Sequence, residues 1–193
     1  MGVISSALVL VSEVSGTPTQ LDRIAQVVPF VILGAALFER WLWRWSPLHP
    51  HIVSMAVLRG TWKGELRTLW QDAAGQQPAP KVVFLAVEQT LTTVSVRLMS
   101  GESASEQIAG TMRRASSGRW TLAAVYVNTP TIDRRAGSPI HHGSLVLTIY
   151  GSPASRLDGA HRTERPSKGR VAFDASSPVV AESFREAQSL TFK

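Results

Sequence analysis

The feature that most constrains this fold is a series of short strand-like runs after Pro50, separated by turn-forming residues. In these runs β-branched or aromatic residues recur with the two-residue period of a half-buried strand. The breaks are rich in Gly, Pro, Ser and Asp. No long helical period interrupts the series. The predicted strands are Leu58–Trp70, Lys81–Gln89, Thr92–Met99, Gln107–Arg114, Arg119–Asn128, His142–Tyr150, Arg156–Arg165 and Gly169–Phe173.

Eight antiparallel strands joined mostly by neighbouring hairpins can close into a barrel, which leaves no exposed sheet edge. We therefore predict an all-β fold, an eight-stranded up-and-down antiparallel barrel of the lipocalin-like kind, over residues 56–193. A two-sheet sandwich is the alternative that the pattern alone leaves open. A barrel of this size has room for packed side chains or for one small ligand.

Strand alternation predicts which side chains point inward. On the first strand Trp62 shares a face with Trp70, and on the fifth strand Tyr126 shares a face with Leu122. On the seventh strand His161, Thr163 and Arg165 share a face. An inward Arg165 beside aromatic rings is suited to a forked contact with a phosphate, although it could equally stack on Trp62 and serve the fold. The predicted ligand-binding residues are Trp62, Tyr126, His161, Thr163 and Arg165.

The end of the chain predicts a short C-terminal helix that covers the barrel. Ser177 is a plausible N-cap, and Pro178 suits the first helical position. Val180, Phe184 and Ala187 then fall on one side at helical spacing.

An apolar segment at the front of the chain, residues 24–45 (IAQVVPFVILGAALFERWLWRW), predicts a transmembrane helix. It reaches the ~20 residues that a spanning helix needs, and its tryptophans cluster at one end like an interfacial belt. A second apolar run, residues 3–14, predicts a short first helix. Residues 1–50 are thus predicted to be a membrane anchor with one or two spans. A cleaved signal peptide and a buried core helix are the alternatives.

Charge supports this division. Up to Ala56 the chain has 3 Arg against 3 Asp or Glu, whereas the rest has 17 Lys or Arg against 11 Asp or Glu and so holds the whole +6. Arg40 and Arg44 lie at the C-terminal end of the apolar segment and Arg59 follows it, so the positive-inside rule places the barrel in the cytoplasm. A basic domain favours anionic partners such as nucleotides, nucleic acid or lipid head groups, although a solvated surface gives the same charge.

Motifs for catalysis are missing from the sequence. It has no phosphate-binding Gly-x-x-x-x-Gly-Lys loop, no Gly-x-Gly-x-x-Gly fingerprint, no Gly-x-Ser-x-Gly elbow and no cysteine. His141 and His142 are adjacent on a strand and point opposite ways, so they do not form a metal pair. We predict that the protein is not an enzyme and carries no cofactor and no metal.

Two segments point to a family. Residues 58–66, LRGTWKGEL, have the pattern Leu-x-Gly-x-Trp-x-Gly, and residues 156–173, RLDGAHRTERPSKGRVAF, have Leu-x-Gly-x-aromatic-x-Thr-x-Arg and then Gly-x-Val, with His161 in the aromatic position. Set after an apolar anchor, they resemble the two-transmembrane β-barrel effectors of bacterial cyclic-oligonucleotide antiphage signalling (CBASS). In that family the aromatic position usually holds an aromatic residue, and the first membrane helix is longer than residues 3–14 allow.

The resemblance implies a function. A partner CD-NTase would make a cyclic dinucleotide on infection, and the barrel would bind this ligand. The anchored protein would then form a homo-oligomer, disrupt the lipid of the inner membrane and kill the cell. No DNA partner is expected. Two rivals remain open, a membrane-tethered lipocalin-like carrier of an apolar ligand and a scaffold subunit with a filled barrel.

Overall fold

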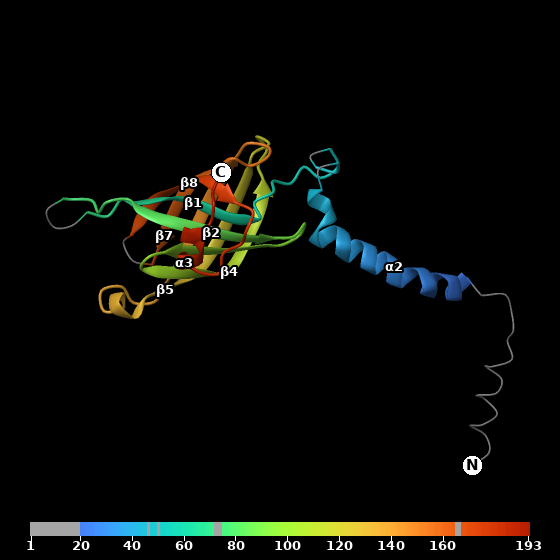
Figure 1. Ribbon diagram of the computed structural model, residues 1–193, viewed down its shortest axis with the longest axis horizontal. Coiled ribbons are helices and arrows are strands. Elements are labelled where there is room, and N and C mark those ends of the chain that lie inside the picture. Colours follow the sequence, from blue (N-terminus) through green and yellow to red (C-terminus); the bar gives the residue numbers. More distant parts are fainter. Residues whose placement is uncertain (1–19, 46, 50, 72–74, 165–166) are drawn as a thin grey trace, which may run out of the picture. The chain divides into compact units, whose positions relative to one another are not determined.

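The computed structural model describes residues 20–45, 47–49, 51–71, 75–164 and 167–193, with side chains from residue 25 onward (Figure 1). The chain divides into two compact units, Met1–Glu39 and Arg40–Lys193. The predicted first helix, residues 3–14, lies outside the described residues.

Helix α2, Gln20–Arg40, makes up the described part of the first unit and ends one residue into the second. Its apolar side chains lie on the surface of the unit, with Phe30 74% and Ile32 63% exposed. In the part of the chain that the structure describes, no helix has both the length and the apolarity to cross a bilayer.

The predicted continuation of this helix to Trp45 is wrong. After Arg40 the chain makes a turn and a short 3-10 helix, η1, Leu42–Arg44. Trp43 in η1 is completely buried, whereas Trp41 and Trp45 are exposed. At the end of η1 the backbone of Trp45 is already extended, with ψ 132°.

The second unit is the predicted closed antiparallel barrel, with strands in the order β1 to β8 and β1 paired with β8. Closure excludes the two-sheet sandwich. Most strands match their predicted ranges closely, but β4 begins earlier and β8 ends later than predicted. The strands are β1 Gly60–Thr68, β2 Lys81–Gln89, β3 Val94–Ser100, β4 Ser103–Arg114, β5 Trp120–Pro130, β6 His141–Tyr150, β7 Arg156–Thr163 and β8 Lys168–Ser177.

Two glycines of β1 allow the barrel to close. A Cβ atom on Gly60 would lie 2.2 Å from the carbonyl oxygen of Ser177, and one on Gly64 would lie 2.0 Å from that of Ala172. Both contacts are with the backbone of β8, so no side chain can be accommodated by a small rotation. Gly60 also has φ 136°, in a region that favours glycine.

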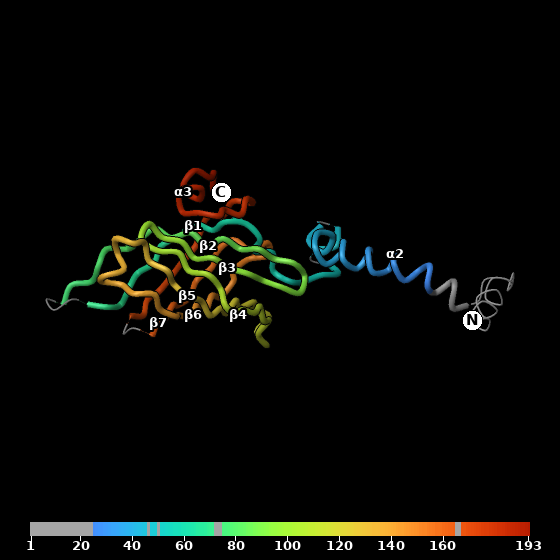
Figure 2. The backbone as a smooth tube through the Cα atoms, turned by 90° about the horizontal axis from the view of Figure 1, so that it is seen from below, coloured from blue at the N-terminus to red at the C-terminus, as the bar shows by residue number. Residues whose placement is uncertain are grey.

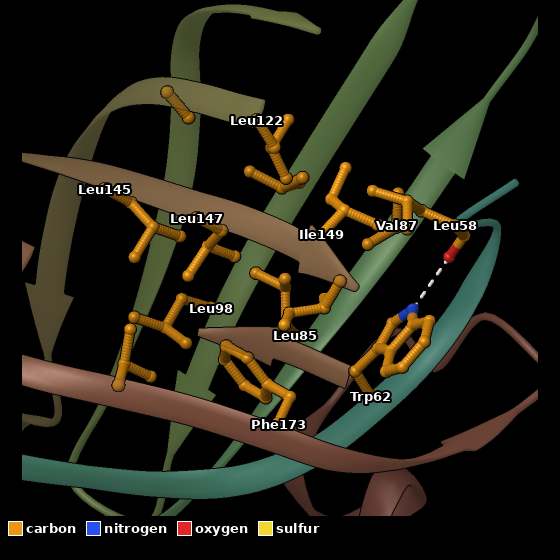
Figure 3. Close-up of a cluster of buried hydrophobic side chains, with 14 of the residues drawn as sticks. Leu58, Trp62, Leu85, Val87, Leu98, Leu122, Leu145, Leu147, Ile149 and Phe173 are labelled. Atoms are coloured by element: carbon orange, nitrogen blue, oxygen red, sulfur yellow. Dashed lines mark hydrogen bonds between the residues drawn. The ribbon is translucent and has the colours of Figure 1, made fainter. Parts of the chain in front are cut away.

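A hydrophobic core fills the middle of the barrel and the end at which β1 begins (Figure 3). Leu58, Leu85, Leu147 and Phe173 are each 1% exposed or less. Trp62 packs among them, and its indole Nε1 donates a hydrogen bond to the carbonyl oxygen of Leu58 at 2.9 Å. Leu58 precedes β1, and the other residues are the inward-facing members of their strands, as alternation predicts.

A second cluster covers the outer face of β2 and β3. Phe84 and Met99 are buried there against the C-terminal segment that carries helix α3, Phe184–Ser189 (Figure 2). The Phe84 ring lies 5.4 Å from that of Phe184 and 5.6 Å from that of Phe192, measured between centroids. The predicted helix is therefore present and covers the side of the barrel.

The predicted N-cap of this helix is wrong. Ser177 is the last residue of β8, because its backbone pairs with Thr61 of β1. The N-cap lies six positions later along the chain, where the Ser183 side chain accepts a hydrogen bond from the Glu186 amide. Strand pairing that closes the barrel thus takes precedence over the local capping signal.

Candidate functional site

The barrel has a cavity of about 390 Å³ at the end where β1, β3, β5 and β7 finish. The core leaves this end unfilled, so the cavity forms an open mouth, whereas the other end is closed. A volume of this size falls in the range of small-molecule pockets. Leu66, Val83 and Leu98 form apolar parts of its wall. Its polar lining includes Thr68, Ser100, Ser105, Tyr126, Asn128, His161 and Thr163.

Tyr126 lies against a glycine of the neighbouring strand. Gly143 is its partner in the β5–β6 register, and a Cβ atom on Gly143 would lie 2.5–2.6 Å from the Tyr126 ring and hydroxyl. The missing side chain makes the space that the ring occupies. Burial raises the pKa of the Tyr126 phenol, so the group is neutral at physiological pH. Tyr126 therefore offers the cavity a flat aromatic surface and a neutral hydroxyl.

His161 has a similar arrangement on β7, two strands away from Tyr126. Gly169 of β8 is its partner in the register, and a Cβ atom there would lie 2.5 Å from the ring nitrogen Nε2. The side chain is buried, and Nε2 has no hydrogen-bond partner. Burial lowers the pKa of His161 below its usual value, so the imidazole is neutral at pH 7.

Two further polar side chains lie deep in the mouth. The Ser105 hydroxyl donates to Asn128 Oδ1 at 2.8 Å, and both residues are at most 9% exposed. This bond uses the Asn128 oxygen as an acceptor, so its amide nitrogen keeps its donor capacity. Buried polar groups are costly unless they are paired, and the bond between Ser105 and Asn128 meets this requirement. Both residues line the cavity, so the Asn128 amide nitrogen is placed where a ligand can accept a hydrogen bond from it.

Charges at the rim of the mouth are largely paired. Lys81 Nζ donates to Glu102 Oε2 at 2.5 Å, and Arg134 Nη2 lies 3.5 Å from Glu102 Oε1. The hydrogen bond from Lys81 is the main cause that lowers the pKa of Glu102. Lys81 and Glu102 both line the cavity. The mouth thus combines a neutral interior with one ion-pair network at its rim.

The structure brings together three of the five predicted site residues. Tyr126, His161 and Thr163 all line the cavity. Trp62 does not, because it lies in the core near the closed end. Arg165 lies outside the described residues, so its contact with a ligand stays a prediction.

The closed end is held by a buried glutamine. Gln89 Oε1 accepts a hydrogen bond from the Leu58 amide at 2.7 Å, and its Nε2 donates to the Ala56 carbonyl at 2.9 Å. These bonds fix the segment before β1 across the barrel bottom. Elsewhere, no group of three or more His, Asp or Glu side chains among the described residues comes together to hold a metal ion.

A comparison with family models gives the identity of this domain. The model of the Cap15 cyclic dinucleotide receptor domain matches residues 53–173. The chain belongs to this family. The resemblance to CBASS effectors is therefore confirmed. No curated protein matches the chain.

The Cap15 match begins just before β1 and ends within β8, so it includes the residues that form the mouth. The matched domain is a receptor domain, which supports a cyclic dinucleotide as ligand and a sensor that is not an enzyme. The C-terminal segment with α3 follows the matched region.

Sequence reasoning missed Ser105, Asn128 and Lys81. Asn128 could have been predicted, because it follows Tyr126 by two residues and so faces the same way. Ser105 was missed because β4 was predicted to begin at Gln107, after this residue. Lys81 lies at the first position of β2, where alternation alone does not show that the strand end borders a cavity.

Proposed function

We propose that this Cap15 protein binds a cyclic dinucleotide in the mouth of its barrel and acts as a membrane-anchored effector. The observation that carries the proposal is the cavity of about 390 Å³ lined by Tyr126, His161 and the Ser105–Asn128 pair. It offers aromatic surface and neutral hydrogen-bonding groups, which are the features that recognise nucleobases.

In this proposal the bases enter the mouth and the phosphates stay near its rim. Tyr126 stacks on one base, and the Asn128 amide hydrogen-bonds to a base edge. Lys81 is available to a phosphate if that phosphate competes with Glu102 for it. The predicted forked contact of Arg165 would add to this grip.

The anchor belongs to the same proposal. α2 carries exposed Val27, Phe30, Val31, Ile32 and Leu33, an apolar surface that requires a nonpolar partner. Lipid of the inner membrane supplies one, with the barrel in the cytoplasm as the positive-inside rule predicts. Ligand binding then favours a homo-oligomer that disrupts the membrane, and a functionally linked CD-NTase supplies the ligand. Binding shifts assembly only if the ligand has higher affinity for the assembled state.

The test is calorimetric titration of the full chain in nanodiscs with a panel of cyclic dinucleotides. We expect one of them to bind with a micromolar or lower Kd. A Tyr126→Ala variant should bind it more weakly, and a Val125→Ala variant, at an exposed position next to Tyr126 on β5, should bind it normally. If no member of the panel binds, the ligand assignment is wrong.

The membrane step needs its own assay. The full chain in vesicles loaded with a self-quenching dye should release the dye when the bound cyclic dinucleotide is added, and the Tyr126→Ala variant should not. If the cyclic dinucleotide binds but no dye is released, the proposed receptor function stands and the proposed membrane disruption is refuted.

A second candidate is supported by the apolar wall. Leu66, Val83 and Leu98 line the cavity and would suit an acyl chain. A tethered carrier of an apolar ligand would bind a fatty acid in the same titration and would not respond to any cyclic dinucleotide.

A further inference from the structure

The barrel has a second hollow, at the closed end and away from the mouth. Its volume is about 320 Å³, and it lies between the segment before β1, the β4–β5 turn and the β6–β7 turn. Arg114, Arg119, Trp120 and Tyr150 line it, together with His49 and Ser54. None of these residues takes part in the proposed cyclic dinucleotide site.

The two arginines are held in place by uncharged groups. Arg114 Nε donates to the carbonyl oxygen of Gly118 at 3.1 Å. The Arg119 guanidinium lies over the Tyr150 ring, 5.4 Å from its centroid. Trp120 Nε1 donates to the carbonyl oxygen of Ser54 at 3.1 Å, which fixes the indole beside them.

No carboxylate neutralises this hollow, since no Asp or Glu is among its described lining residues. The mouth differs, because Glu102 pairs with both Lys81 and Arg134 there. Two guanidinium groups with no acidic partner attract an anion, and the planar fork of arginine matches phosphate oxygens. An aromatic wall beside them suits the less polar part of a phosphate ester.

The position of the hollow in the chain points to the source of that phosphate. Residues 41–48 join the end of α2 to His49, a stretch that spans at most about 30 Å. Trp41 and Trp45 in this stretch are 52% and 61% exposed, as expected of side chains at a membrane interface. If α2 is in the bilayer, the hollow is within reach of its headgroups.

We propose that the closed-end hollow, formed by Arg114, Arg119 and Trp120, binds the phosphate of an anionic phospholipid. This inference rests on the proposed membrane anchoring. The bound headgroup would hold the closed end toward the membrane and leave the mouth open to the cytoplasm. Juxtamembrane basic clusters recognise anionic lipids in this way.

The experiment compares lipids on the full chain in neutral detergent micelles. Phosphatidylglycerol or phosphatidylcholine is added, and lipid adducts are counted by native mass spectrometry. The test variant is Arg114→Gln/Arg119→Gln. The control is Arg162→Gln/Arg170→Gln, which removes the same charge from two exposed positions on β7 and β8.

We expect phosphatidylglycerol to bind in preference to phosphatidylcholine, and we expect the test variant to lose roughly tenfold or more of this binding. The control should bind like the unmodified chain. Equal loss in both variants, or no preference for phosphatidylglycerol, would overturn the proposal. The proposal would also be overturned if glycerol phosphate, or a short single-stranded DNA, saturated the site at the same concentration as phosphatidylglycerol, because either result would identify a different ligand.

A cyclic dinucleotide titration on the same samples separates this outcome from the proposed function. Normal titration of the test variant shows that its barrel is folded, so its loss of lipid belongs to the hollow. If the chain prefers phosphatidylglycerol but binds no cyclic dinucleotide, the proposal that the mouth binds a cyclic dinucleotide is refuted, and the proposal that the closed-end hollow binds a phospholipid stands.

Discussion

Adding one methyl group at Gly143 should weaken ligand binding in the mouth while the barrel stays folded. The three atoms nearest to a Cβ at this position all belong to Tyr126, at 2.5 to 2.6 Å, whereas ordinary contact begins at 3.4 Å. The Gly143→Ala substitution therefore requires the Tyr126 ring to move by about 1 Å, a shift that a side chain can make by rotation. Gly143 of β6 lies on one side of the ring, and the ring also lines the cavity, so we expect it to move into the space that the ligand would occupy.

The magnitudes separate folding from binding. Overpacking of this kind costs about 1–3 kcal/mol, which a domain with about 5–15 kcal/mol of stability survives. Base stacking on an aromatic ring contributes about 1–3 kcal/mol, so its loss should raise the Kd for the cyclic dinucleotide roughly 5- to 150-fold. The Gly159→Ala substitution should behave differently, because its Cβ would lie 1.8 Å from the backbone oxygen of Val146 and the barrel itself must distort.

Calorimetric titration gives the Kd and urea unfolding gives the stability of each variant. The matched control is Gly137→Ala, because a Cβ there has nothing within 4 Å. The double variant Tyr126→Leu/Gly143→Ala should recover stability, since the clash is gone, and should still bind weakly, since the ring is gone. If Gly143→Ala loses stability as expected but binds the ligand with the original Kd, Tyr126 is not part of the site.

Three other predictions concern the rest of the barrel. Gln89→Leu leaves two buried backbone groups without partners and should lower the free energy of unfolding by about 2–5 kcal/mol, whereas Gln188→Leu on the exposed face of α3 should change it by under about 0.5 kcal/mol. The pKa of His161 is lower in the folded chain than in the unfolded chain, so the unfolded chain takes up the proton first as the pH falls below about 6.5. The unmodified chain should therefore lose more stability between pH 7 and pH 5.5 than the His161→Phe variant. Equal loss in both would contradict a buried neutral imidazole. Phe84→Ala should cost about 3–5 kcal/mol and loosen the C-terminal segment in hydrogen exchange, whereas Val82→Ala, about half exposed, should leave that segment protected.

The number and order of the strands could be predicted because the same signal repeats eight times. Alternation identifies both a strand and its inward face, so Leu122 and Tyr126 were correctly placed inside the barrel. Local signals were less reliable where long-range pairing competes with them. Ser177 has the chemistry of an N-cap, yet its hydrogen bonds to β1 close the barrel and are worth more to the fold.

The site was predicted only in part for a related reason. Alternation shows that Trp62 and His161 both face inward, but not how far along the barrel each one lies. That distance depends on strand register and tilt, which place Trp62 in the closed core and His161 in the mouth. The glycines that make room for the rings give no sequence signal of their own, because Gly143 and Gly169 act through their cross-strand partners.

The two ends of the barrel carry different chemistry, and this difference constrains how a bound ligand could affect the anchor. The mouth has neutral polar groups and a paired rim, while the segment that continues from the anchor crosses the closed end and is fixed there by Gln89. Between them lies a core in which Leu85, Leu147 and Phe173 are essentially fully buried. A core packed in this way transmits a displacement instead of absorbing it, because its side chains have no empty space to move into. A ligand that shifts the strands at the mouth therefore has a physical route to the segment before β1, through the bonds that Gln89, Trp62 and Trp120 make to it.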